Sequence, residues 1–412
     1  MSLLIKNVTA ITMCEETRVL ENAYIATREN RISYLGTKKP EGTFDEVIDG
    51  HGMVAMPGLI NAHTHTAMTL LRSYADDMNL QDWLFQKIFP FEDTLTPEMV
   101  YEGSVRGIKE MLSTGTTCFH DMYFFQEETA KAAEELGIRG VLCEGITDPV
   151  LEKKIEKTEK LIEQVKKSEG RLQVGISPHA VYTCNEDTLK TCADYAKKHG
   201  FRIHTHLSET KTENQDAEKA YGMSPTKWME QCGLFDNPTM AAHCVWLSDE
   251  DIAILKKYDV TVVHNPVSNL KLASGIAEIP KLVNKGVNVA LGTDGASSNN
   301  NLDLFEEIKL TGILHKGTSL DPTMLPAWEV LKMATINGAK ALGFDDLGML
   351  KTGYLADLIL LDFEKPHLTP NHNTVSNLVY AVSGADVAYT VVDGRIVYCR
   401  GMQKPKFLSE TL

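Results

Sequence analysis

The sequence has 412 residues, enough for two or three domains or for one large barrel with an accessory part. Its 43% hydrophobic and 24% charged residues are ordinary values for a globular protein and exclude disordered, collagen-like and disulfide-scaffold classes. Acidic residues outnumber basic ones by 56 to 41, and the formal net charge of -15 disfavours nucleic acids and anionic membrane surfaces as partners.

Hydropathy and cysteine spacing bear on the location of the protein. No stretch approaches the roughly 20 apolar residues that cross a bilayer, and Lys6 and Asn7 interrupt the apolar N-terminus, so we expect a soluble, unprocessed chain. The eight cysteines contain no C-x-x-C pair, and several lie inside apolar runs. Buried free thiols are typical of the reducing cytoplasm, which is the location we expect.

The two ends of the chain share one pattern. Residues 2–56 and about 356–400 alternate apolar and polar side chains with a period of two, and turn residues such as Asn30 and Gly394 interrupt them. This pattern predicts antiparallel strands. Because neither end is large enough for a core of its own, we expect residues 1–56 and 356–412 to build one small composite β-sandwich.

Residues 57–355 alternate short β-like segments with longer stretches of helical periodicity, which predicts repeated βα units. Eight strands joined by helical crossovers are typical of a (β/α)8 TIM-type barrel, an α/β fold. The expected strands are residues 59–63, 116–121, 139–145, 172–179, 201–206, 239–243, 260–264 and 287–294.

Each expected strand ends in a polar residue. Hydrated loops explain any single case, because polar residues commonly end strands. Five histidines among eight strand ends, from only 13 in the chain, favour a convergent site instead, at the face where such barrels carry their chemistry. The strand ends are His63, Asp121, Glu144, His179, His206, His243, His264 and Asp294.

The clearest local motif is PGLINAHTH at residues 57–65, where a strand delivers His63 and His65 two residues apart and therefore on one face. A lone H-x-H also arises by chance and packing. His206 and Asp294 could complete a set of three nitrogens and one carboxylate. That set suits a divalent transition metal, with zinc as the first candidate and iron, manganese and cobalt as others.

These motifs together resemble the amidohydrolase superfamily and, within it, the methylthioadenosine/S-adenosylhomocysteine deaminases. The resemblance covers essentially the whole chain. The motifs that carry it are, in chain order, PGLINAHTH, SPHAVYT, HTHLSE, AAHCVWL, HNPVSNLKL, LGTDGASSNNN, GYLADLILLD and VVDGRIVY.

The resemblance implies a single metal ion bound by His63, His65, His206 and Asp294. Relatives with two metals carry a carbamoylated lysine at the end of the fourth strand, whereas residues 172–183 contain no lysine. One ion is therefore the expected count.

The resemblance also implies roles in hydrolytic deamination of a purine nucleoside. Asp294 would take the proton of the attacking water, Glu209 would carry protons to the ring, and His243 would orient the attacking oxygen. Glu92 and His179 would contact the substrate, Glu92 through ribose hydroxyls. The competing interpretations are a solvated loop glutamate for Glu209 and a hydrogen-bonded barrel histidine for His243.

One position departs from the family. Relatives that accept S-adenosylhomocysteine carry an arginine at the end of the third strand, where this chain has Glu144. An acidic side chain would repel the homocysteine carboxylate. We therefore expect 5'-methylthioadenosine, adenosine or 5'-deoxyadenosine to be better substrates than S-adenosylhomocysteine.

Several alternatives remain open from the sequence. The substrate could be a free base or a triazine, as in guanine deaminases or chlorohydrolases, or the chain could be a noncatalytic metal-binding protein. The sequence does not decide between a monomer and a homo-oligomer. His204 is expected one layer below the metal site, and His264 could support that site. The histidines expected at the surface are His51, His199, His315, His367 and His372.

Overall fold

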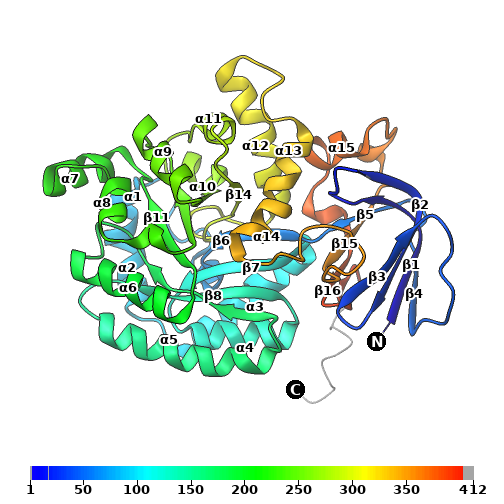
Figure 1. Ribbon diagram of the computed structural model, residues 1–412, viewed down its shortest axis with the longest axis horizontal. Helices are drawn as coiled ribbons and strands as arrows, with labels where there is room; N and C mark the ends of the chain where they lie inside the picture. Colours follow the sequence, from blue (N-terminus) through cyan, green and yellow to red (C-terminus); the bar gives the residue numbers. More distant parts are fainter. Residues whose placement is uncertain (1, 17, 402–412) are drawn as a thin grey trace.

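The computed structural model describes residues 2–16 and 18–401 (Figure 1). In its larger part, helices lie around two parallel sheets, and in its smaller part, strands from both ends of the chain lie side by side (Figure 1). The chain is therefore an α/β protein with parallel sheets, as predicted. No helix in the described residues is both long and apolar enough to span a membrane.

Strands from both ends of the chain form one eight-stranded sheet. These strands are β1 (Ser2–Ile11), β2 (Val19–Arg28), β3 (Arg31–Gly36), β4 (Glu46–Asp49), β5 (Met53–Pro57), β15 (Leu358–Asp362), β16 (Val387–Val392) and β17 (Arg395–Cys399). Their order is β17-β16-β15-β5-β1-β2-β3, and β4 pairs with β1. The N-terminal strands thus meet the C-terminal strands where β5 pairs with β15.

This sheet differs from the prediction in strand direction. Strand β1 runs parallel to both β4 and β5, so the expectation of antiparallel pairing throughout is wrong. A period of two reports which face of a strand is buried but not the direction of its neighbour. The described strands pair as one sheet, and the predicted two-layer sandwich is not confirmed. The boundaries at residues 56 and 356 stay a prediction, and residues 402–412 lie outside the described part.

All eight strands expected in the middle of the chain are present, the fourth divided into two pieces. They are β6 (Leu59–Thr64), β7 (Thr116–Tyr123), β8 (Arg139–Ile146), β9 (Leu172–Val174), β10 (Ser177–Pro178), β11 (Ile203–Leu207), β12 (Thr239–His243), β13 (Thr261–His264) and β14 (Val289–Leu291). One parallel sheet has the order β10-β8-β7-β6 with β9 paired to β8, and the other has the order β11-β12-β13-β14.

The two parallel sheets adjoin at both edges. At one edge Ile176 forms an isolated parallel bridge with Ile203, and at the other the Asp294 amide donates to the His63 carbonyl at 3.0 Å. The described strands are nevertheless paired as two sheets and not as a closed barrel. One buried apolar cluster joins them, with members from six of the strands: Ile60, Cys118, Val141, Met240, Val263 and Ala290.

Helices alternate with the parallel strands, and several start at side-chain caps. Thr96, Asn185 and Thr210, for example, accept from backbone amides in the first turn of the helix that follows. The helices are α3 (Pro97–Ser113), α4 (Gln126–Leu136), α5 (Leu151–Val165), α6 (Glu186–His199), α7 (Lys211–Tyr221), α8 (Pro225–Gln231), α9 (Asp249–Lys257), α10 (Pro266–Lys271), α11 (Ile279–Asn284), α12 (Leu304–Ser319), α13 (Ala327–Met333), α14 (Ile336–Leu342) and α15 (Thr374–Tyr380).

A long insertion follows β6 and lies over the end of the parallel strands that carries the site. It contains η1 (Thr66–Leu71), α1 (Leu80–Trp83), the π-helical turn η2 (Leu84–Ile88) and α2 (Phe89–Glu92). Its buried side chains form a separate apolar cluster with Tyr123 and Leu272. Short 3₁₀ turns complete the chain at η3 (Lys166–Ser168), η4 (Leu234–Asp236), η5 (Pro366–Leu368) and η6 (Gly384–Asp386).

Candidate active site

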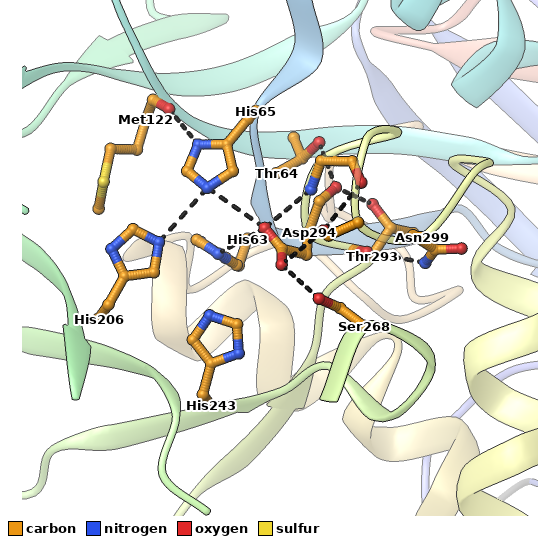
Figure 2. Close-up of polar contacts among 12 residues, drawn as sticks. His63, Thr64, His65, Met122, His206, His243, Ser268, Thr293, Asp294 and Asn299 are labelled. Atoms are coloured by element: carbon orange, nitrogen blue, oxygen red, sulfur yellow. Dashed lines mark hydrogen bonds and ion pairs between the residues drawn. The ribbon is translucent and has the colours of Figure 1, made fainter. Parts of the chain in front are cut away.

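Four side chains predicted as metal ligands converge above the ends of the parallel strands (Figure 2). His63 lies near the end of β6, His65 directly follows that strand, His206 lies in β11 and Asp294 follows β14. The Nε2 atoms of His63 and His65 lie 3.3 and 3.2 Å from Oδ1 of Asp294. Nε2 of His206 lies 3.3 Å from Nε2 of His65. The structure therefore brings the four together, from three strands far apart in the sequence.

The donor chemistry of this cluster fits a divalent cation. Nε2 of His63 is buried without a hydrogen-bond partner. The ligand atoms of His63, His65 and His206 lie within 4.8 Å of one another, and so do those of His63, His243 and Asp294. Imidazole nitrogens gathered around one carboxylate oxygen are the donors that zinc and related metals prefer.

Hydrogen bonds on the far side of two rings turn their Nε2 atoms inward. Nδ1 of His65 donates to the Met122 carbonyl, and Nδ1 of His206 donates to the His179 carbonyl at 2.9 Å. A backbone carbonyl can only accept, so each ring carries its neutral-state proton on Nδ1 and keeps a lone pair on Nε2.

Charge in the cluster is set by Asp294. Burial lowers the pKa of His63 to about 4 and holds that of His206 well below its usual range, so both rings are neutral. Burial also acts against a proton on His65, but the hydrogen bond to Asp294 and its negative charge raise the His65 pKa to about 9. Burial would raise the pKa of Asp294, yet its contacts with His63 and His65 hold it well below its usual range. The carboxylate thus draws one positive charge to this place, either a proton or a metal cation.

Asp294 and His243 are held in backbone conformations that side chains seldom adopt. Their φ angles are 62° and 72°. Oδ2 of Asp294 accepts from Ser268 Oγ at 2.6 Å and from Ser298 Oγ at 2.9 Å, which leaves Oδ1 facing the histidines (Figure 2). Such strain is typical of functional sites, where surrounding contacts must enforce it.

Glu209 and His243 lie beside the cluster, as predicted. Nε2 of His243 is 3.8 Å from Oε2 of Glu209, and Nδ1 of His243 is 2.8 Å from Oδ1 of Asn269. Oε1 of Glu209 accepts from Ser274 Oγ at 3.1 Å. Burial raises the pKa of Glu209, which makes the carboxyl group a better proton carrier near neutral pH. Its backbone is fixed by Glu213, whose Oε2 accepts from the Glu209 amide at 2.7 Å.

Glu92 and His179 line a pocket that opens onto the cluster. The same pocket is lined by His65, His206, Glu209, His243 and Asp294, together with the aromatic side chains Trp83, Phe89, Tyr123, Phe124 and Tyr182. Burial raises the pKa of Glu92 to about 7 and lowers that of His179 to about 3, so His179 is neutral. A pocket with apolar walls and a few converging polar groups is typical of a small-molecule site.

The environment of Glu144 contradicts the expected repulsion of anions. Glu144 is buried, and its Oε1 lies 2.7 Å from Nζ of Lys154 and 3.5 Å from Nζ of Lys157. Two ammonium groups thus accompany one carboxylate. Both lysines, with Lys153, line a wider vestibule that shares Glu92 with the inner pocket. Glu144 is therefore not the isolated negative charge that the expectation assumed, and the preference among substrates stays a prediction.

The remaining histidines divide into buried and exposed groups. His204 lies one layer below the cluster, as expected, with Nε2 3.0 Å from Nδ1 of His63. The prediction for His315 is wrong, because it is buried on the inner face of α12 with Nε2 3.3 Å from Nε2 of His264. Within the described residues, the hydrogen-bond partner of the His264 ring is His315 and not a predicted ligand.

Four supporting residues were not found from the sequence. Ser268, Asn269 and Ser274 hold Asp294, His243 and Glu209 respectively, and Ser298 also holds Asp294. For Ser268, Asn269 and Ser298, the signal was the position of HNPVSNLKL and LGTDGASSNNN at the ends of the seventh and eighth strands, whereas Ser274 lies outside both segments.

Comparisons with known proteins agree with this geometry. The profile of the amidohydrolase family matches residues 54–397. The 5-methylthioadenosine/S-adenosylhomocysteine deaminase of Thermoanaerobacter pseudethanolicus is 48% identical over 403 residues, which cover 96% of this chain and 94% of that protein. The 5'-deoxyadenosine deaminase of Methanosarcina mazei is 46% identical over 403 residues, covering 96% of this chain and 92% of that protein.

A solved structure shows the same arrangement of the chain. An adenosine deaminase from Xanthomonas campestris, with bound zinc, aligns with a TM-score of 0.91 and 34% sequence identity. The alignment covers 96% of this chain and 92% of that one.

Proposed function

Because the chain belongs to the amidohydrolase family, we propose that it is a metal-dependent hydrolytic deaminase of adenosine-type nucleosides. Its substrates would be 5'-methylthioadenosine, S-adenosylhomocysteine, 5'-deoxyadenosine or adenosine, and its products the inosine analogue and ammonia. The observation that carries the proposal is one pocket in which three histidines and Asp294 adjoin Glu209, His243 and Glu92. The names of the similar deaminases support the same substrate class.

One divalent ion, with zinc first, would be held by His63, His65, His206 and Asp294. The contacts of these four residues fit such an ion, and the similar Xanthomonas structure contains zinc. A single ion is supported because residues 172–183, around the end of the fourth strand, contain no lysine. When bound, such an ion lowers the pKa of a coordinated water and supplies a nucleophile near neutral pH.

The surrounding residues would then move protons and orient the reactants. Asp294 accepts a proton from the attacking water through Oδ1, the oxygen that faces His63 and His65 and accepts from the Gly295 amide at 2.8 Å. Glu209 delivers a proton to N1 of the purine, so that negative charge does not build up on the ring as water adds to C6. His243 hydrogen-bonds the added oxygen through Nε2, and ammonia leaves after a further proton transfer.

Glu92 and His179 would select nucleosides over free bases. Glu92 lies at the boundary between the inner pocket and the vestibule, where its two oxygens can accept from two ribose hydroxyls. His179 is neutral, and its Nδ1 is 2.9 Å from Thr183 Oγ1, so its Nε2 stays available to the substrate. A free base or triazine carries no ribose hydroxyls from which Glu92 could accept, which disfavours those alternatives.

The proposal extends to the domain architecture and to the cellular location. The adjoining edges of the two parallel sheets support a (β/α)8 barrel over residues 57–355, and the shared sheet supports a composite domain from the two ends. Eight unpaired cysteines support a reducing compartment such as the cytoplasm.

The proposal is tested by ammonia release from a panel of adenosine derivatives and free bases, with elemental analysis of the purified protein. We expect about one zinc per chain and turnover of nucleosides only. Glu209→Gln should retain zinc and nucleoside binding but lose turnover by about 100-fold or more. The exposed Glu218→Gln, in the helix that follows, serves as the control. Release of ammonia from guanine alone, or full activity of Glu209→Gln, would overturn the assignment.

The vestibule lysines give a prediction about substrate range. Because Glu144 is paired with Lys154 and Lys157, we expect kcat/KM for S-adenosylhomocysteine to lie within about tenfold of that for 5'-methylthioadenosine. Lys157→Met should lower kcat/KM about fivefold to tenfold for S-adenosylhomocysteine, the substrate that carries a carboxylate. The value for 5'-methylthioadenosine should not change. Lys160→Met, on the exposed side of the same helix, is the control. Equal losses for both substrates would contradict a charge contact.

A further inference from the structure

His204 is a buried histidine that contacts the predicted metal ligand His63 and is not a ligand candidate itself. Its Nε2 lies 3.0 Å from Nδ1 of His63, and both rings are fully buried. His63 differs in this respect from His65 and His206, whose Nδ1 atoms face backbone carbonyls. The tautomer of His63 therefore depends on a partner that can itself either donate or accept.

Only one arrangement of protons in this pair leaves His63 able to bind a cation. A lone pair on Nε2 of His63 requires its proton on Nδ1, and that proton must be donated to Nε2 of His204. His204 then carries its own proton on Nδ1, an atom that is buried without a hydrogen-bond partner. In the opposite arrangement, His204 donates to His63, and His63 directs an Nε2 proton at Oδ1 of Asp294, 3.3 Å away.

From this geometry we infer that His204 is a positioning residue that sets the tautomer of His63 and so opens its Nε2 to the metal. The inference rests on the proposed metal site. A buried Nδ1 proton without an acceptor destabilises the fold. The hydrogen bond that Nε2 of His204 accepts from His63 explains why the proton nevertheless lies on Nδ1.

The neighbouring His120 offers a matched control. Its ring centroid lies 4.2 Å from that of His204, and it is equally buried. The hydrogen-bond partner recorded for its ring within the described residues is Cys143, at 3.6 Å, and not a predicted ligand. Replacing His120 therefore disturbs the same part of the core without removing an acceptor from His63.

The test measures zinc affinity by competition with a chelator, in the full-length protein. Wild type should bind zinc, and His204→Leu should bind it about 10- to 100-fold more weakly, because His63 can then place its proton on Nε2. His204→Gln, whose amide oxygen can accept from Nδ1 of His63, should recover most of the affinity. His120→Leu should stay within about threefold of wild type.

The outcomes separate the inference from the proposed function. Wild-type protein that binds no zinc would overturn both. Wild type and His204→Leu with equal affinity, or His204→Gln as weak as His204→Leu, would overturn the inference alone. Should His204→Leu not fold, ¹⁵N spectra of histidine-labelled wild type with zinc decide the matter. They should show His63 and His204 both protonated on Nδ1, and an Nε2 proton on His204 would overturn the inference.

Discussion

Glu92 is the residue through which we expect pH to control nucleoside binding. Burial raises the pKa of its carboxyl group to about 7, although a hydrogen bond with Tyr123 favours the charged form. The carboxylate can accept from two ribose hydroxyls, and protonation removes this capacity. Since protonation increases as the pH falls through 7, KM for 5'-methylthioadenosine should rise about tenfold between pH 8 and pH 6. Steady-state kinetics over this range checks the prediction.

Glu92→Gln separates this effect from titration of other groups. The variant should have a raised KM at pH 8 and a KM that no longer varies across the range. Glu102→Gln, an exposed change on α3, should keep the wild-type profile. A profile that persists in Glu92→Gln would assign the titration to a different group.

Residues at strand ends could be placed from the sequence, whereas the residues that hold them could not. His206 and Asp294 are predictable because parallel strands end at the same edge of a sheet. Ser268, Asn269 and Ser274 lie in α10 and the loop after it, and their positions depend on how that segment folds back over the pocket. Tertiary contacts decide that path, and local periodicity does not report it.

The ion pairs of Glu144, like the supporting residues of the site, could not be predicted from the sequence. Its position at the end of the third strand was predicted correctly, but its pairing with Lys154 and Lys157 was not. These lysines approach Glu144 because α5 packs against β8, and the sequence does not show which strand a helix packs against. The charge of one residue in a sequence therefore does not give the electrostatic potential around that residue in the folded protein.

At the scale of elements, the contact between β14 and β6 fixes the spacing of the site. A Cβ atom at Gly292 would lie 2.8 Å from three atoms of His63. Gly292→Ala must push the end of β14 away from β6, which moves Asp294 relative to His63. We predict a free energy of unfolding lower by about 1–3 kcal/mol and a kcat/KM lower by about 100-fold. Calorimetry and ammonia release measure the two effects.

Gly317→Ala is the matched control for a glycine-to-alanine change. A Cβ atom at Gly317, in α12, would meet nothing within 4 Å, and the residue is exposed. Since alanine favours a helix over glycine, this variant should gain about 0.5–1 kcal/mol with unchanged activity. Wild-type activity in Gly292→Ala would show that the site tolerates separation of the two strands.

The order of elements was predictable in the middle of the chain because buried parallel strands appear as apolar runs between helices. The internal break of the fourth strand was not. The chain between β9 and β10 leaves the β8 ladder at Ile176 and bridges to Ile203 of the other sheet. Which of two neighbours a strand residue pairs with is a property of the assembled sheet.

At the scale of the whole molecule, the terminal sheet packs against the parallel strands through apolar side chains and through ion pairs of the buried Arg139 with Asp357 and Asp393. Ile359 and Val387 share an apolar cluster with Leu59. Arg139 of β8 reaches Asp357, with Nε–Oδ2 and Nη2–Oδ1 distances of 2.7 and 3.0 Å. The composite nature of this sheet was predictable from composition, because neither end could bury a core alone. The ion pair was not, because its partners lie 218 residues apart.

Arg139 should therefore contribute to stability across the junction of the two parts. Asp357 is buried, and its carboxylate loses both guanidinium hydrogen bonds in Arg139→Met. Removal of one partner of a buried pair typically costs about 3–5 kcal/mol, so we predict a loss of that size in the free energy of unfolding. The double variant Arg139→Met/Asp357→Leu removes the buried pair and should recover much of the loss, since well-packed apolar groups replace buried pairs at little cost. Asp393, whose Oδ1 lies 2.6 Å from Nη2 of Arg139, keeps its charge in this variant, but its side chain is partly exposed to water. Denaturant unfolding of wild type and the two variants measures these free energies. A double variant no more stable than Arg139→Met would show that lost packing, and not the unpaired carboxylate, causes the loss of stability.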